Sequence, residues 1–131
     1  MKRSKLLLIP LFLLTLTVNV FADTVPYKKV CKASWYSIQS LKKEGTYQYS
    51  KGVMANGEKF NENDLTCATR MYPLGSRLRI THAASGRSCI VRVTDRIGKR
   101  FATKRIDLSK AAFMQIADLY RGLVYVRVEK I

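Results

Sequence analysis

The chain has 131 residues, of which 24 are Lys or Arg and nine are Asp or Glu, so its formal net charge is +15. This length is enough for one compact domain with its own core and too short for two. The charge indicates an anionic partner, and nucleic acid is the first candidate of that kind.

The first 22 residues have the pattern of a secretory signal. Three basic residues among the first five precede an uncharged, leucine-rich stretch over residues 6–22, which ends in small residues that suit a signal peptidase. Pro10 interrupts the stretch, and its apolar part falls short of the roughly 20 residues that span a bilayer, so an uncleaved anchor ranks second. We therefore predict a signal peptide at residues 1–22 and one mature domain at residues 23–131.

Five segments of the mature domain are rich in the β-branched and aromatic residues that favour strands. They are residues 30–37, 65–69, 77–82, 88–94 and 123–130. The third and fourth are joined by a turn that contains Ser85-Gly86, so together they predict a β-hairpin. Residues 38–52 are polar and lysine-rich, and we predict a loop there.

One helix is predicted over residues 110–120, where Ala112, Phe113 and Ile116 recur at helical spacing. Asp107 or Ser109 can cap its first turn, and we favour Asp107 as a structural cap. Several short strands and one short helix indicate an all-β fold with a small helical contribution. A closed barrel is favoured because closure removes exposed strand edges, and an open sandwich is the alternative.

The mature domain contains three cysteines, Cys31, Cys67 and Cys89. Export would place them where a disulfide persists, and we predict a Cys67–Cys89 pair because both lie in predicted strands. Three buried, reduced thiols are the alternative. The cysteine spacing matches no zinc pattern and His82 is the only histidine, so we expect no metal and no cofactor.

Export also changes what the charge implies. All nine acidic residues and 21 of the basic residues follow the predicted signal, which gives residues 23–131 a formal charge of +12. An exported chain meets anionic wall polymers, so we expect a periplasmic or wall-facing monomer that binds no nucleic acid. Because no cysteine stands at the cleavage point, we expect no lipid anchor. We also expect no membrane segment once the signal has been cleaved. Scattered charge that only aids solubility is an equal alternative.

Seven short motifs follow one another along the mature domain. They are Ala33-Ser34-Trp35-Tyr36, Met54-Ala55-Asn56-Gly57-Glu58-Lys59-Phe60, Leu65-Thr66-Cys67-Ala68, Tyr72-Pro73-Leu74-Gly75-Ser76, Gly86-Arg87-Ser88, Val91-Arg92-Val93-Thr94-Asp95-Arg96 and Arg105-Ile106-Asp107-Leu108-Ser109. In this order and at these spacings they resemble the rare lipoprotein A family. The resemblance implies a six-stranded double-psi β-barrel, shared with expansin-type domains, in an envelope protein that acts on peptidoglycan glycan strands.

The chain departs from that family at two places. Members with lytic transglycosylase activity carry a histidine four residues before the proline of the Pro-Leu-Gly turn, and here that position is Thr69. We expect His82 to be a solvated turn residue that does not replace it. The second departure follows Asp95-Arg96, where the family continues Gly-Pro and this chain has Ile97-Gly98, so we expect a differently shaped loop there.

Asp95 is the predicted catalytic residue, because it matches the family's catalytic aspartate. It also continues the row of Cys89, Val91 and Val93 to a strand end, where partial burial would raise its pKa. One carboxyl group suffices for a lytic transglycosylase. It protonates the glycosidic oxygen and then, as its conjugate base, takes the proton of the muramoyl 6-hydroxyl, which leaves a 1,6-anhydro product. The alternative is that Asp95 only braces Arg96 or a loop amide.

Three further side chains are predicted to bind substrate: Thr69 through its hydroxyl, Arg96, and Tyr36 by stacking on a sugar ring. Trp35 and Tyr36 are neighbours on a strand and face opposite ways, so one of them belongs to the core. Two functions follow. The first is a lytic transglycosylase that cleaves between N-acetylmuramic acid and N-acetylglucosamine; the second, which Thr69 favours, is a non-catalytic, expansin-like module that binds wall glycans.

Overall fold

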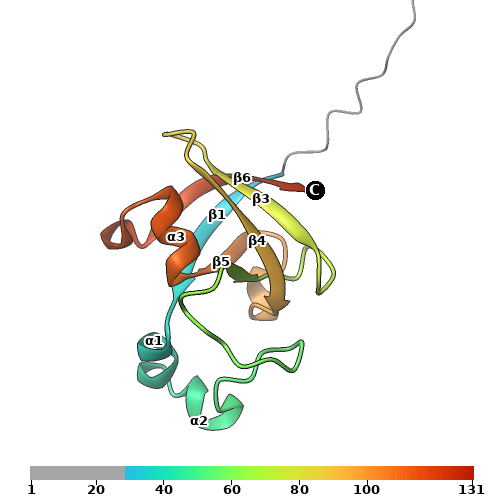
Figure 1. The fold of residues 1–131 in the computed structure, drawn as a ribbon, viewed down its shortest axis with the longest axis vertical. Coiled ribbons are helices and arrows are strands. Elements are labelled where there is room, and N and C mark those ends of the chain that lie inside the picture. Colours follow the sequence, from blue (N-terminus) through green and yellow to red (C-terminus); the bar gives the residue numbers. More distant parts are fainter. Residues whose placement is uncertain (1–28) are drawn as a thin grey trace, which may run out of the picture.

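The structure, a computed structural model, describes residues 29–131, and the predicted signal peptide at residues 1–22 lies outside them. Six strands form one closed barrel in the order β1-β5-β2-β4-β3-β6 (Figure 1). Their bounds are β1 Lys29–Tyr36, β2 Thr66–Ala68, β3 Arg77–His82, β4 Ser88–Asp95, β5 Arg105–Ser109 and β6 Leu123–Lys130. The pairs β1–β5 and β2–β4 are parallel and the other four are antiparallel. The predicted six-stranded barrel is confirmed, and the open sandwich is wrong.

The apolar row of each long strand fills the barrel, as the period-2 pattern predicts. In β4, Ile90 and Arg92 point outward between buried neighbours, and in β6 the same is true of Tyr125 and Arg127. The buried members of these rows are Cys31, Ala33, Leu78, Ile80, Cys89, Val91, Val93, Ile106, Leu108, Val124, Val126 and Val128. The barrel interior is therefore a packed core and not a channel.

Helix α3 (Lys110–Ile116) packs against the barrel, with Phe113 and Ile116 fully buried in the same core. Its cap corrects the prediction: Ser109 Oγ accepts a hydrogen bond from Ala112 N at 3.2 Å, whereas Asp107 lies within β5 and caps nothing. The helix is also shorter than predicted. It stops at Ile116, and a separate 3₁₀ turn, η2, spans Leu119–Arg121.

The predicted loop at residues 38–52 is wrong, because it contains two short helices, α1 (Ile38–Lys43) and α2 (Thr46–Ser50). They lie at the end of the molecule away from the β3–β4 hairpin tip (Figure 1). Two serines start α1: Ser37 Oγ accepts from Ser40 N at 3.1 Å, and Ser40 Oγ accepts from Ser37 N at 2.8 Å. None of the helices described is long and apolar enough to cross a membrane.

All three cysteines are buried free thiols, so the predicted Cys67–Cys89 disulfide is wrong. Each faces the barrel interior, and Cys89 Sγ lies 3.6 Å from the carbonyl oxygen of Ala112. Burial raises the pKa of Cys31 and of Cys89 to about 11 and also raises the pKa of Cys67. The three side chains therefore act as small apolar residues of the core.

Candidate functional site

A groove of about 510 Å³ lies beside four neighbouring strands, β1, β5, β2 and β4. The remaining lining residues come from α1 and its C-terminal end, from Thr46 at the start of α2, from residues 96–98 and from the 3₁₀ turn η1 (Lys99–Phe101). An apolar cluster separate from the barrel core lies beneath, and Tyr36, Ala68 and Ile97 belong to both the cluster and the groove. The cluster contains the last residues of β1 and β2, Tyr36 and Ala68, and so fixes the ends of these two strands beside the groove.

Two aspartates line the groove on either side of Ala68. The register partner of Ala68 is Asp95 in β4 and Asp107 in β5. Because neighbouring strands lie about 4.8 Å apart, the backbones that carry the two carboxyl groups are about 10 Å apart. The methyl group of Ala68 fills little of the space between them, so a carboxyl group flanks each side of the groove.

The surroundings of Asp107 change the proton affinity of its carboxyl group. Burial raises its pKa from 3.8 to about 6, although a hydrogen bond from Ser34 and the positive charge of Arg105 oppose the rise. Ser34 Oγ donates to Asp107 Oδ1 at 2.9 Å. A carboxyl group that holds its proton up to about pH 6 is suited to general acid catalysis near neutral pH.

Asp95 stands at the end of β4 and is held by backbone amides. Its Oδ1 accepts hydrogen bonds from Ala55 N at 3.0 Å and from Arg96 N at 2.8 Å. The predicted alternative, bracing of a loop amide, is therefore present. The guanidinium of Arg96 is not its partner, since Arg96 Nη1 donates at 2.7 Å each to the carbonyl oxygens of Thr69 and Tyr72. Asp95 thus lines the groove with an oxygen fixed as an acceptor.

Tyr36 lines the same groove as Asp95 and Asp107. Its ring stacks on Phe60 with centroids 4.3 Å apart, and its hydroxyl is buried without a hydrogen-bond partner among the described residues. Burial first, then the negative charges of Asp95 and Asp107, raise the pKa of this hydroxyl. The hydroxyl therefore stays protonated and lies within electrostatic range of both aspartates. The hydroxyl oxygen has almost no exposed surface in this structure, so it is an unsatisfied polar group within the groove wall.

Thr69 does not line the groove. Its side chain is fully buried, and its Oγ1 accepts a hydrogen bond from Met71 N at 3.1 Å. The prediction that its hydroxyl binds substrate is wrong, because a bound glycan cannot reach it in this structure. Arg96 does line the groove, but its Nη1 serves to hold the Thr69 and Tyr72 carbonyls.

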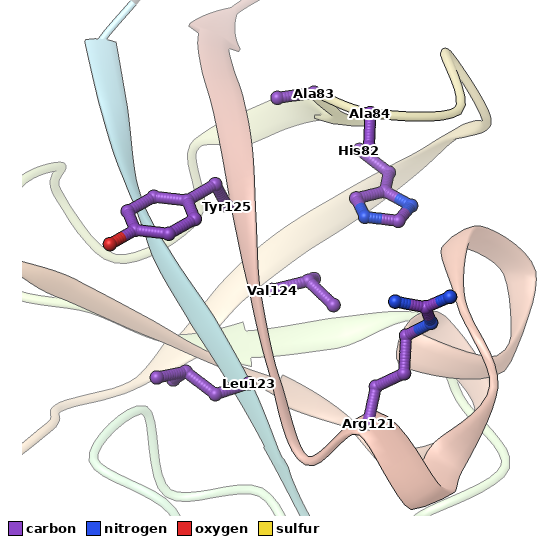
Figure 2. A pocket seen from close by; sticks show the side chains of 7 residues that line it. All are labelled: His82, Ala83, Ala84, Arg121, Leu123, Val124 and Tyr125. Atoms are coloured by element: carbon purple, nitrogen blue, oxygen red, sulfur yellow. The ribbon is translucent and has the colours of Figure 1, made fainter.

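His82 lies at a second hollow, of about 490 Å³, away from the groove (Figure 2). Figure 2 shows its ring and the guanidinium of Arg121 pointing into the same space. The predicted solvated turn histidine is wrong: His82 is buried, with Nδ1 3.1 Å from the Ile116 carbonyl oxygen and 2.9 Å from Ser85 Oγ. It does not line the groove and cannot serve the two aspartates there.

Trp35 and the two tyrosines of α2 have different positions relative to the groove. Trp35 packs against the barrel core and donates from Nε1 to the Leu119 carbonyl oxygen at 3.0 Å, so its position is fixed. Tyr36 belongs to the separate cluster, and both Trp35 and Tyr36 line the groove, so the structure does not divide them into one core residue and one groove residue. Tyr47 and Tyr49 lie in α2, outside the groove lining.

Among the groove residues that the sequence prediction did not identify are Arg100, Phe101 and Arg105. The signal for one of them was present: Arg105 and Asp107 alternate with Ile106 and Leu108, which places both charged side chains on one face of a strand. Nothing in the sequence places Arg100 and Phe101 there, because their position depends on the path of the loop after β4.

Comparisons with known proteins agree on one family. Residues 28–128 match the family described as lytic transglycolase. The endolytic peptidoglycan transglycosylase RlpA of Pseudomonas aeruginosa is 37% identical over 109 residues, which cover 83% of this chain and 29% of that protein. The uncharacterized protein ssl3177 of Synechocystis sp. is 38% identical over 84 residues, which cover 64% of this chain and 88% of that protein.

A solved structure shares the fold. An expansin of Clavibacter michiganensis, in complex with cellohexaose, superimposes with a TM-score of 0.58 at 16% identity, covering 80% of this chain and 50% of that chain. The chain thus matches an expansin in its barrel, and it spans less than a third of the length of the Pseudomonas aeruginosa relative.

Proposed function

The chain belongs to the lytic transglycolase family, and we propose that it cleaves peptidoglycan glycan strands between N-acetylmuramic acid and N-acetylglucosamine. One observation carries the proposal: two of the three carboxyl groups that line the groove have different environments, since that of Asp107 is partly buried and that of Asp95 is fixed by backbone amides. Pairs of carboxyl groups with different environments are how glycan-cleaving sites separate acid from base.

In the proposed reaction, Asp107 donates its proton to the glycosidic oxygen as the bond from that oxygen to the anomeric carbon breaks. The oxygen of the muramoyl 6-hydroxyl attacks the anomeric carbon, and its proton passes to the carboxylate of Asp95. The products are a 1,6-anhydromuramoyl end and a free N-acetylglucosamine hydroxyl, and no water is consumed. Proton exchange with solvent resets both side chains. This division changes the sequence prediction, which gave both roles to Asp95.

Tyr36 has a binding role in this proposal. Tyr36 lines the groove, and a small shift of its wall on binding would let a hydroxyl or acetamido group of the sugar give the buried hydroxyl the partner that the protein does not supply. Arg96, whose Nη1 holds two carbonyl groups, offers its other donors to the glycan. Replacing Tyr36 with Phe should therefore weaken glycan binding while leaving the folded state as stable as before or more so, because the change removes an unpaired buried group.

The proposed place of action is the cell envelope, outside the cytoplasm. The relatives named for peptidoglycan transglycosylase activity support it, and so does the formal charge of +12 on residues 23–131, which suits an anionic polymer. The proposed partner is the glycan strand, and we propose that a monomer acts on it.

The test is incubation of the purified domain, residues 23–131, with isolated sacculi, followed by mass spectrometry for 1,6-anhydromuramoyl ends. Wild type should form them, and Asp95→Asn and Asp107→Asn should each lower the rate by about 10² to 10⁴. Asp118→Asn is the matched control, because Asp118 is exposed and caps nothing through its side chain. The absence of anhydro ends at high protein concentration would contradict the proposal.

One observation favours the second function, a non-catalytic glycan-binding module. The family's histidine position holds Thr69, whose hydroxyl is buried away from the groove. If this function is correct, the domain should sediment with sacculi and form no anhydro ends, and Tyr36→Phe should reduce sedimentation while Asp107→Asn should not abolish it.

A further inference from the structure

The guanidinium groups of two arginines pack over one aromatic ring in the lining of the groove. The guanidinium carbons of Arg100 and Arg105 each lie 4.6 Å from the centroid of the Phe101 ring. All three residues line the groove that contains the two aspartates. Arg105 comes from β5 and the other two from η1, so two separate segments bring the positive charges together.

This arrangement follows from the departure in the loop after β4. Ile97 is buried in the apolar cluster beside the groove, and the chain then turns through η1, which places Arg100 and Phe101 in the groove wall. Arg70 Nε donates to the Ile97 carbonyl oxygen at 2.5 Å and ties the loop to the segment after β2. The loop that carries Arg100 is thus anchored at its start.

Neither guanidinium has a hydrogen-bond or salt-bridge partner within residues 29–131. Both side chains contact Phe101, and the charge of Arg105 also acts on the Asp107 carboxyl group from a distance. Other arginines have such partners: Arg92 pairs with Glu58 at 2.9 Å, and Arg96 holds two carbonyl groups. A guanidinium that is oriented by stacking and keeps its donors free is suited to bind a carboxylate.

We propose that Arg100 and Arg105, oriented by Phe101, form a subsite for a carboxylate carried by the lactyl ether of the muramoyl residue. The inference rests on the proposed function, since it assumes that the groove binds peptidoglycan. Arg105 and Asp107 are two residues apart on one strand, so their Cα atoms are about 7 Å apart on the same face. The anomeric carbon and the lactyl ether belong to the same sugar ring, and one muramoyl residue therefore spans both side chains.

Two sources carry this chemistry. On a strand without stem peptides the lactyl carboxylate itself is free, whereas on a peptide-bearing strand that carboxyl group is an amide and the carboxylates belong to the peptide. A subsite of two arginines should distinguish either form from a strand of the same length without a charge. It would give the groove a preference that the two aspartates cannot supply, because they repel anionic groups.

The test measures binding by calorimetry at about pH 8, where Asp107 has lost its proton and cleavage is slow. Four ligands of equal length are compared: a strand with free lactyl carboxylates, the same strand with these groups converted to primary amides, a peptide-bearing strand, and a chitin oligomer. Mass spectrometry after each titration checks that the strand is intact. Wild type should bind at least one carboxylate-bearing strand more tightly than the amidated strand, by about fivefold for each arginine contact.

Arg100→Gln and Arg105→Gln should each reduce that preference, and the double variant should bind all four ligands alike. Arg121→Gln is the matched control, because Arg121 also stacks on an aromatic ring, Tyr120, but lies outside the groove. It should keep the full preference. Tighter binding of the strand with free lactyl carboxylates would identify the lactyl carboxylate as the bound group. Tighter binding of only the peptide-bearing strand would identify the peptide carboxylates.

Three results would overturn the subsite: equal wild-type affinity for all ligands, no binding of any ligand, or an equal loss in Arg121→Gln. Its failure differs from failure of the proposed reaction. If sacculi are cleaved but the domain shows no carboxylate preference, the subsite proposal alone is contradicted. If the domain shows a carboxylate preference that depends on the two arginines but forms no anhydro ends, the proposed reaction alone is contradicted.

Discussion

Replacing Asp107 with Asn removes one buried charge at nearly constant size, and its effect on stability should depend on pH. Burial raises the pKa of Asp107 from 3.8 to about 6 in the folded state, against the opposing effects of Ser34 and Arg105. In the unfolded chain the carboxyl group has its ordinary pKa. The folded state therefore holds the proton more tightly than the unfolded state, and stability falls as pH rises through this range.

The magnitude follows from the two pKa values. Below pH 3.8 both states are protonated and the carboxyl group costs nothing; above about pH 6 both are ionised and the whole cost is present. At about 1.36 kcal/mol for each pH unit, that cost is about 3 kcal/mol. Asn keeps an oxygen that can accept the hydrogen bond from Ser34 Oγ. Asp107→Asn should therefore be more stable than wild type by up to about 3 kcal/mol at about pH 8 and nearly equal to it below about pH 4.

The assay is urea unfolding at a series of pH values, followed through the fluorescence of the single tryptophan, Trp35. The difference in the free energy of unfolding should grow between about pH 4 and about pH 6 and then level off. A difference that does not change with pH, or a variant less stable than wild type at about pH 8, would refute the account of Asp107 as a buried carboxyl group.

Three further predictions concern residues for which the structure differs from the sequence prediction. Thr69→His puts a larger ring in a fully buried position, so it should cost about 1 to 3 kcal/mol in urea unfolding and should not increase anhydro ends; a gain in product would show that position 69 reaches the groove. Without a reductant, a thiol reagent should label none of Cys31, Cys67 and Cys89 in the folded protein and all three after denaturation. Labelling of only one thiol in the denatured protein would indicate that the other two form a disulfide. Ser109→Ala should lower the stability of the domain by about 1 kcal/mol through the loss of the α3 cap, and an unchanged melting temperature would contradict that role.

The barrel was predictable because its long strands carry a repeated physical signal. In β4 and β6, exposed residues alternate with buried ones over the first six positions of each strand, so the period is visible without any knowledge of the partners. Helices α1 and α2 have six and five residues and bury none, so no apolar period marks them. Their formation depends on caps such as the pair of Ser37 and Ser40 and on contacts between the two helices.

The candidate site was predictable only in part. Asp95 and Tyr36 were identified from motifs, and the structure brings both into one groove. Asp107 was assigned to a cap because it precedes a helical segment, whereas strand pairing opposite Ala68 turns it into a groove carboxyl group. Its raised pKa arises from burial by residues distant in the chain, which no local pattern contains.

The central claim is that this groove cleaves glycan strands with a proton from Asp107. The most direct test is the initial rate of anhydro-end formation from sacculi between about pH 4.5 and about pH 8, in wild type and in Asp107→Asn. The account predicts that the wild-type rate falls as pH rises through about 6, the pKa of Asp107, and that the variant is slow at every pH. A wild-type rate that does not fall above pH 6, or a variant as fast as wild type, would contradict it.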